Sequence, residues 1–293
     1  TASPRYRHAM VTVREGHLIG DIPYLAFGNG PPLVALPGLT GDVGHPTGFA
    51  RASQLRPLLP LARHFTVHVL NRRSGLPPRY SLGDLADDFA AGIGVEFRPP
   101  VPVLGVSTGG SVALQLAADH PALVSRLVVV AAACRLSEQG RRGQQRLVEL
   151  IEAGQPRRAW ALIGRLSAGS YLTGQAMAAM LWLLAPALTP HDPSALRALV
   201  AAEDRFDLGE RLADISAPTL LIGGVHDRYY SPTLFRRTAL GITGAQLRLL
   251  PRAGHAGTIT HRGATRDMVR FLTSTEPVQV LEPLHHIRGP AAP

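Results

Sequence analysis

The stretch "VLGVSTGGSVALQLA", residues 103–117, carries the pattern from which the fold and the function are predicted. Its apolar start gives way, from Thr108 onward, to apolar residues at helical spacing, which places Ser107 on a sharp turn between a strand and a helix. Such a turn needs small residues two positions to either side, and Gly105 and Gly109 supply them. We expect the serine hydroxyl to project from the carboxyl edge of a sheet, beside a helix N-terminus that favours negative charge.

Short apolar runs alternate with helical patterns along the chain, as in parallel βαβ units. Strands rich in Val, Leu and Ile on both faces are predicted at 33–36, 66–70, 101–106, 126–131, 219–223 and 246–250. An antiparallel pair at about 11–14 and 22–27 would precede them. The predicted fold class is therefore α/β, with a mostly parallel central sheet and helices on both of its faces.

One segment breaks the alternation. Residues 135–205 show helical patterns but no convincing strand, and the run at 177–188 is apolar nearly all round. We interpret 135–205 as a helical insertion in a core domain formed by 1–134 and 206–275. The last residues, 276–293, contain four prolines and are predicted to form a surface-bound or disordered tail.

Several helices have recognisable starts. Ser81 and Asp84 match a capping box that opens a helix running to about Gly94. Ser231 followed by Pro232 matches an N-cap with proline at the first helical position. A last helix is expected over about 264–274.

A serine hydroxyl needs a base to become a nucleophile, and the base needs a group that orients it. Asp227 follows one predicted strand, in "LLIGGVHDRYYSP", and His255 follows the next, in "PRAGHAGT". Each falls in a loop at the carboxyl edge where Ser107 is expected. The glycine-rich turn "LPGLTGD" after an early strand adds the backbone N–H of Leu39, which together with that of Thr108 could hold an oxyanion.

Taken together, these motifs resemble those of the α/β-hydrolase family over about residues 20–274. The stretches that carry the resemblance are "LPGLTGD", "GVSTGGSVALQLAADHP", "LADISAPTLLIGGVHDRYYSP" and "AGHAG". The resemblance implies that Ser107 is the nucleophile, His255 the general acid and base, and Asp227 the carboxylate that orients the histidine. It also implies that Leu39 and Thr108 supply the oxyanion amides, and that the insertion is the family's variable cap, which shapes substrate choice.

The sequence departs from the family at two positions. Many members have a histidine where this chain has Pro37, and an acidic residue where it has Asn71. Neither departure touches the three predicted catalytic residues, because the oxyanion donor is a backbone amide.

Alternatives exist for several positions. His226 and His261 compete with His255 as the base, and Glu138 competes with Asp227 as the acid. His45 and Trp182 are candidates for the substrate pocket. The alternative for His45 is a solvated loop residue, and the alternative for Trp182 is packing between helices of the insertion. Cys134 is expected to be a buried small residue, and the paired histidines at 285–286 lack further ligands at metal-binding spacing.

The composition excludes several kinds of chemistry. All 30 basic residues are arginine, so the chain has no lysine for a P-loop, a Schiff base or pyridoxal attachment. The net charge is +9, but the arginines are scattered, so no nucleic-acid partner is expected. No apolar run of about 18 residues that would cross a membrane was identified. No signal-peptide pattern opens the sequence, so a cytoplasmic protein is expected, with prior removal of a leader left open.

The sequence therefore predicts a serine hydrolase, with no metal and no cofactor, that cleaves an ester, lactone or thioester of a hydrophobic small molecule through an acyl-enzyme. Such a protein is a carboxylic ester hydrolase. Carbon–carbon bond hydrolysis, acyl transfer and perhydrolysis by the same residues are alternatives, as is a small-molecule binding protein with little turnover. The oligomeric state is open.

Overall fold

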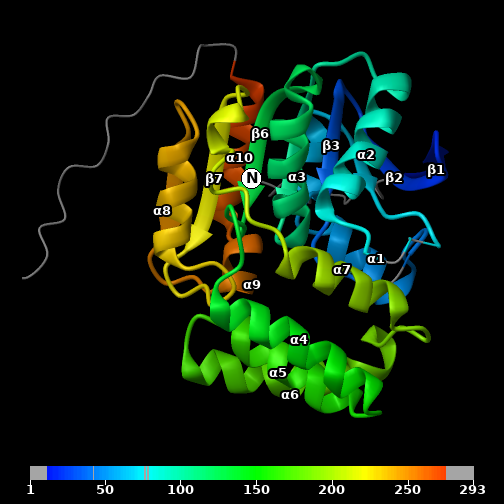
Figure 1. The fold of residues 1–293 in the computed structure, drawn as a ribbon, viewed down its shortest axis with the longest axis vertical. Coiled ribbons are helices and arrows are strands. Elements are labelled where there is room, and N and C mark those ends of the chain that lie inside the picture. Colours follow the sequence, from blue (N-terminus) through cyan, green and yellow to red (C-terminus); the bar gives the residue numbers. More distant parts are fainter. Residues whose placement is uncertain (1–11, 42, 76, 78, 275–293) are drawn as a thin grey trace, which may run out of the picture.

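The computed structural model describes residues 12–41, 43–75, 77 and 79–274. It contains an eight-stranded sheet in the order β1-β2-β4-β3-β5-β6-β7-β8 (Figure 1). The strands are β1 (Val13–Leu18), β2 (Ile22–Gly28), β3 (Pro32–Leu36), β4 (Thr66–Leu70), β5 (Val101–Val106), β6 (Val124–Val130), β7 (Thr219–Gly224) and β8 (Gln246–Leu250). β1 pairs antiparallel with β2 and β2 with β4, whereas all other pairs are parallel. The predicted fold class is confirmed.

The helices that join these strands are α1 (Gly48–Leu55), α2 (Leu82–Glu96), α3 (Thr108–Asp119), α4 (Glu138–Glu152), α5 (Pro156–Ser167), α6 (Tyr171–Leu188), α7 (Ser194–Asp204), α8 (Pro232–Gly241), α9 (His255–Ile259) and α10 (Arg262–Thr273). Short 3₁₀ turns lie at η1 (Leu59–Arg63), η2 (Pro121–Leu123) and η3 (Leu212–Asp214). The predicted starts of α2 and α8 agree with the structure. Ser81 and Asp84 form a reciprocal capping box, and the Ser231 side chain accepts a hydrogen bond from the backbone of Leu234.

The six predicted parallel strands lie within two residues of their expected bounds, but the first predicted strand was placed wrongly. It was expected at about 11–14, whereas β1 runs from Val13 to Leu18. In the sheet formed by the described residues, β1 is an edge strand that pairs with β2 alone, and most of its side chains are polar and exposed or half-buried. A strand of this kind lacks the alternating apolar signal on which the prediction depended.

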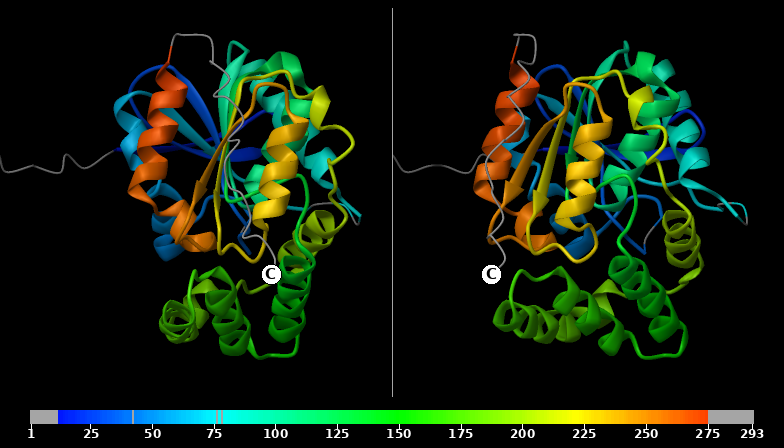
Figure 2. Two further views of the ribbon diagram at one scale, coloured as in Figure 1. Left: turned by 90° about the vertical axis from the view of Figure 1, so that its left-hand side faces the viewer. Right: turned by 60° about the vertical axis from the view of Figure 1, so that its left-hand side comes forward.

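The sheet is buried on both faces because successive side chains of a strand point to opposite sides. Val34 packs with the helices α2, α3 and α8 in one core, whereas its neighbour Leu33 packs with α1 and α10 in another. Figure 2 shows α8 and α10 on opposite sides of the sheet. The core is thus a three-layer α/β/α sandwich, with the strand runs apolar on both alternating faces.

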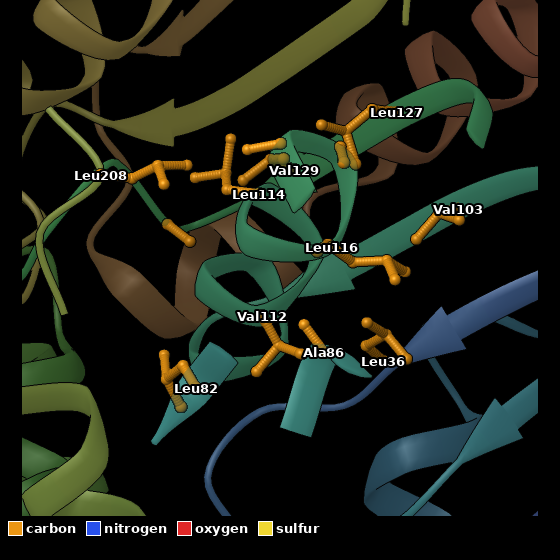
Figure 3. Close-up of a cluster of buried hydrophobic side chains, with 14 of the residues drawn as sticks. Leu36, Leu82, Ala86, Val103, Val112, Leu114, Leu116, Leu127, Val129 and Leu208 are labelled. Atoms are coloured by element: carbon orange, nitrogen blue, oxygen red, sulfur yellow. The ribbon is translucent and has the colours of Figure 1, made fainter. Parts of the chain in front are cut away.

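The helix α3 is the most deeply enclosed of these helices. All of its residues except Gln115 and Asp119 are buried. Figure 3 shows Val112 of α3 beside Ala86 of α2, and Leu114 beside Val129 of the sheet. Because α3 is packed on several sides, it rigidly supports the residues at its N-terminus, Ser107 and Thr108.

Helices α4 to α7 lie between β6 and β7 in the chain, within the segment 135–205 that was interpreted as an insertion. Figure 1 places them beyond the edge of the sheet to which the arrows of the parallel strands point. The insertion has a small core of its own, formed by Leu147, Val148, Leu150, Ile151, Ala159, Leu196 and Val200. Within 135–205 the structure contains no strand. The predicted tail at 276–293 lies outside the described residues.

The helix α6 corrects one expectation. It has 18 residues, a mean hydropathy of 1.3 and no charged residue, so by length and composition it matches a membrane-spanning segment that the sequence analysis did not identify. It packs along α5, yet only 17% of it is buried. The structure therefore leaves a long apolar helix largely exposed on the insertion.

Candidate active site

The backbone at Ser107 has the conformation of a sharp strand-to-helix turn. Its φ is 54° and its ψ is −127°, a left-handed region that non-glycine residues rarely adopt. The turn is held by a 2.9 Å hydrogen bond from the Ser107 N–H to the carbonyl of Val130. A Cβ at Gly105 would lie 2.3 Å from the carbonyl oxygen of Gly109, and a Cβ at Gly109 would lie 2.1 Å from that of Leu36. Both glycines are therefore required for the backbone to turn this closely.

The structure brings Ser107, His255 and Asp227 together. The Ser107 hydroxyl oxygen lies 2.9 Å from Nε2 of His255, and Nδ1 of His255 lies 2.8 Å from Oδ2 of Asp227. The other carboxylate oxygen of Asp227 accepts hydrogen bonds from the backbone N–H groups of Tyr229 and Tyr230, at 2.8 and 3.1 Å. Asp227 and His255 are both buried. These contacts fix the carboxylate and allow it to orient the imidazole toward the serine.

The competing histidines and acid have other positions. His226 is exposed, and Nδ1 of His261 accepts hydrogen bonds from the first backbone N–H groups of α10. Glu138 is exposed on α4, where a hydrogen bond from Arg141 lowers the pKa of its carboxyl. Cys134 is buried, and burial raises the pKa of its thiol, which disfavours the reactive thiolate.

The loop after β3 lies directly against Ser107. A Cβ at Gly38 would lie 3.1 Å from the Cβ of Ser107 and 3.7 Å from its hydroxyl oxygen. The next residue, Leu39, lines the same cavity as Ser107. On the other side, the Thr108 N–H belongs to the first turn of α3, where backbone N–H groups have no acceptor within the helix. Leu39 therefore lines the cavity at Ser107 and Thr108 directly follows the serine, and the oxyanion role of their amides stays a prediction.

A cavity of about 260 Å³ opens beside Ser107 and His255. Its walls come from the end of β3 and the following loop, α1 and the turn after it, helices α4 and α5, the end of β5, the loop after β7, and α9. The lining residues besides Ser107 and His255 are Leu36, Pro37, Gly38, Leu39, Thr40, Ser53, Gln54, Pro57, Leu58, Val106, Gln144, Leu147, Trp160, Ile163, Ser167, Tyr229 and Ile259. Most of these side chains are apolar, so the cavity favours an uncharged, hydrophobic ligand.

Neither predicted pocket residue is among the residues that line this cavity. His45 bonds through Nε2 to the carbonyl of Gly16 and packs edge-on against His17, so it supports the β1–β2 hairpin. Trp182 is exposed on α6, with the Arg157 guanidinium 4.3 Å from its ring. The tryptophan of the cavity is Trp160, whose indole N–H donates to the Thr189 hydroxyl at 3.0 Å.

Three buried residues near the site were missed by sequence reasoning. The ring of Tyr229 lies 4.7 Å from that of His255, and burial raises the pKa of its phenol. The ring of Tyr230 is stacked with that of His255, with 6.1 Å between the ring centroids. Glu203 of α7 accepts a hydrogen bond from the Thr108 hydroxyl at 2.8 Å. The tyrosines adjoin Asp227 and could have been found from that proximity, but nothing in the local sequence around Glu203 marks it.

Comparison with known proteins agrees with this architecture. The model of a family described as the alpha/beta hydrolase family matches residues 33–267. The chain belongs to the α/β-hydrolase family. Proteins of similar sequence are named hydrolases and esterases, so this α/β-hydrolase is an enzyme of that class.

Two relatives illustrate the range of names in the family. A protein from Variovorax paradoxus, named as a carbamate hydrolase, RutD, is 28% identical over 238 residues, which cover 75% of this chain and 85% of that protein. A pimeloyl-[acyl-carrier protein] methyl ester esterase from Neisseria meningitidis is 29% identical over 185 residues, 62% of this chain and 72% of that protein. Among solved structures, the enol-lactonase from Burkholderia xenovorans LB400 superposes with a TM-score of 0.72 at 20% identity, covering 89% of this chain and all of that one. This last likeness concerns the fold.

Proposed function

We propose that this α/β-hydrolase is a serine esterase that cleaves an ester, lactone or thioester of a hydrophobic small molecule. The observation that carries the proposal is the continuous chain of contacts from Ser107 through His255 to Asp227 at the wall of an apolar cavity. A hydroxyl, an imidazole and a carboxylate in this arrangement are suited to nucleophilic attack on a carbonyl carbon.

The proposed reaction has two halves. In the first, the Ser107 oxygen attacks the carbonyl carbon while its proton passes to Nε2 of His255. The negative oxygen of the tetrahedral intermediate is held by the amides of Leu39 and Thr108, and loss of one such donor costs about 3 kcal/mol in the barrier. His255 then protonates the leaving alcohol or thiol, and an acyl-serine remains. In the second half, His255 takes a proton from water as the water oxygen attacks the acyl carbon. The bond between that carbon and the Ser107 oxygen then breaks, His255 returns the proton to the serine oxygen, and the acid is released.

The nature of the substrate is inferred from the cavity and supported by the relatives. Apolar side chains form the larger part of the cavity lining, and Ser53, Gln54, Gln144 and Ser167 are among the polar side chains between them. A carbamate, named for one relative, and a methyl ester, named for another, both offer an acyl carbon to a serine. We favour the ester because burial of an acyl chain against hydrophobic walls stabilises the complex by about 25 cal/mol per Å² of apolar surface removed from water.

The experiment that tests this proposal uses a fluorophosphonate probe on the wild type and on Ser107→Ala, with the adduct located by mass spectrometry. We expect labelling of the wild type at Ser107 and none of the variant. Esters of graded acyl length, with carbamates in the same panel, then define the substrate class. A folded wild type that resists both this probe and a smaller one would contradict the proposal and favour a binding protein.

A further inference from the structure

Glu203 is a carboxylate with no exposed surface, on the helix α7 of the insertion. Its oxygens accept four hydrogen bonds: from Thr108 Oγ1 at 2.8 Å, Gln144 Nε2 at 3.0 Å, Ser111 Oγ at 3.0 Å and the Tyr230 hydroxyl at 2.7 Å. All four donors are uncharged. Within the part of the chain that the structure describes, no arginine or histidine forms an ion pair with Glu203. Burial of a carboxylate without a cationic partner costs free energy, which suggests that Glu203 has a role beyond packing.

The donors of these bonds belong to three separate parts of the candidate active site. Thr108 follows the nucleophile and presents one of the two oxyanion amides. Tyr230 presents a backbone N–H to Asp227, and Gln144 lines the cavity from α4. The Glu203 carboxylate is therefore a junction between the serine turn, the loop that holds the acid, and the insertion. It also lies at the first turn of α3, where the helix dipole favours a negative charge.

We propose that Glu203 is a positioning residue for the proposed hydrolysis, on which this inference rests. Its hydrogen bonds hold the Thr108 amide and the Asp227 loop in the positions that catalysis requires. Because Glu203 belongs to α7, packing of the insertion against the core aligns the catalytic residues at the same time. An oxyanion donor must be placed within a few tenths of an ångström, which a fully satisfied buried network can ensure.

Inactivation by the fluorophosphonate provides a test that needs no substrate. The rate at saturating probe reports on Ser107 and the oxyanion site, and the half-saturating concentration reports on probe binding. We expect Glu203→Gln to lower the saturating rate 10- to 100-fold and to change the half-saturating concentration less than threefold, because an amide cannot accept from all four donors. Thr108→Val, which removes only a hydroxyl, should act in the same direction, and Thr108→Ser should label at least five times faster than Thr108→Val.

A matched control is Thr238→Val, which removes a buried hydroxyl that bonds the backbone of Cys134 and Leu234 in another part of the core. It should label within threefold of the wild type. Saturating rates within threefold of the wild type for Glu203→Gln and Thr108→Val would overturn the inference while leaving the proposed function intact. If Glu203→Gln fails to fold, the labelling rates of Thr108→Val, Thr108→Ser and Thr238→Val test the inference without it. A wild type that does not label overturns the proposed function, and this inference with it.

A second, independent observation concerns the exposed face of α6. The side chains of Tyr171, Leu172, Met180, Trp182 and Leu183 are 75, 79, 48, 40 and 69% exposed, and the helix carries no charge. Exposed apolar surface of this extent on a soluble domain marks a binding surface.

Arginines of α5 flank this face. The Arg157 guanidinium covers the Trp182 ring, and Nε of Arg165 donates to Gln175 of α6 at 3.3 Å. Arg158 is exposed on the same helix. Among the ion pairs of the described residues, none involves these three arginines, whereas the acidic residues of the neighbouring α4 pair with other arginines.

We infer that the α5–α6 hairpin docks on an anionic lipid surface. An apolar helix face bordered by arginines, with a tryptophan at the boundary, combines burial in the interface with attraction to acidic headgroups. A two-fold contact between copies of this chain would bring together arginines that have no ion pair among the described residues, and the repulsion between these like charges disfavours a second copy as the occupant.

Sedimentation with vesicles tests the inference. We expect the wild type to bind phosphatidylglycerol vesicles at least tenfold more tightly than phosphatidylcholine vesicles, with binding that weakens as salt rises. The double variant Leu172→Glu/Leu183→Glu should lose at least tenfold in affinity, whereas Leu240→Glu, at a leucine 84% exposed on α8, should bind like the wild type. Equal binding to both lipids, or unchanged binding of the double variant, overturns the inference. A wild-type dimer that the double variant converts to a monomer would also overturn it and assign the face to a second copy.

Discussion

Nε2 of His255 lies 2.9 Å from the hydroxyl oxygen of Ser107, although 148 positions separate the two residues in the chain. Each sits at the start of a helix, Ser107 directly after β5 and His255 five residues after Leu250, the end of β8. The parallel sheet therefore brings residues that are far apart in the sequence within hydrogen-bond distance. The side-chain carboxylate of Asp227, 2.8 Å from Nδ1 of His255, completes the chain of contacts.

The Asp227→Asn variant should test whether the carboxylate orients His255. The amide preserves volume but can present an N–H where the histidine needs an acceptor, so the wrong tautomer is favoured. We expect hydrolysis of the best ester in the panel to fall on the order of 10³- to 10⁴-fold. Asp214→Asn, which alters an exposed carboxylate paired with Arg211, is the matched control and should retain wild-type turnover. Similar losses in both variants would argue against a catalytic role for Asp227.

The Gly109→Ala variant should damage both folding and activity. The added methyl group would lie 2.1 Å from the carbonyl of Leu36, so the β3 loop or the first turn of α3 must move. We expect a loss of about 3 kcal/mol in the free energy of unfolding, measured by urea denaturation, since overpacking of this kind is costly. Gly94→Ala, an exposed helical site with open space around it, should instead stabilise by about 0.5–1 kcal/mol. Equal effects of the two substitutions would contradict the geometry described for the turn.

The Trp160→Ala variant should change the acyl-length preference. Trp160 lines the cavity, so its removal enlarges the space available to an acyl chain. We expect the optimum of kcat/KM across a series of acyl esters to move to longer chains by at least two carbons, with a stability loss of about 3 kcal/mol. Trp182→Ala removes the only other tryptophan, which is exposed on α6, and should leave the profile in place. A shift in the second variant alone would assign the pocket to α6.

His68 should make stability depend on pH. Burial, the largest cause, lowers the pKa of its imidazole, and Arg14 adds to the effect, whereas a bond to the Thr66 carbonyl opposes it. The unfolded chain then binds the proton more readily than the folded protein, so the free energy of unfolding falls as pH decreases through the ordinary histidine range near about 6.5. We expect His68→Gln to reduce the loss of stability between about pH 8 and pH 5, measured by urea denaturation. A variant with the full wild-type pH dependence would show that His68 is not the group responsible.

The amino-acid sequence by itself determined the elements whose signals are local. The parallel strands, the capping box at Ser81 and the turn at Ser107 each depend on a few neighbouring residues, and strand order brings Asp227 and His255 to one edge once the fold class is known. Tertiary packing decided the rest. The uniformly apolar α6 has no preferred face, so its pattern could not show that Trp160 rather than Trp182 reaches the cavity. Glu203 lies 95 positions from Thr108, and only the seating of α7 against α3 brings that carboxylate to the serine turn, because contacts between distant side chains depend on how whole elements pack.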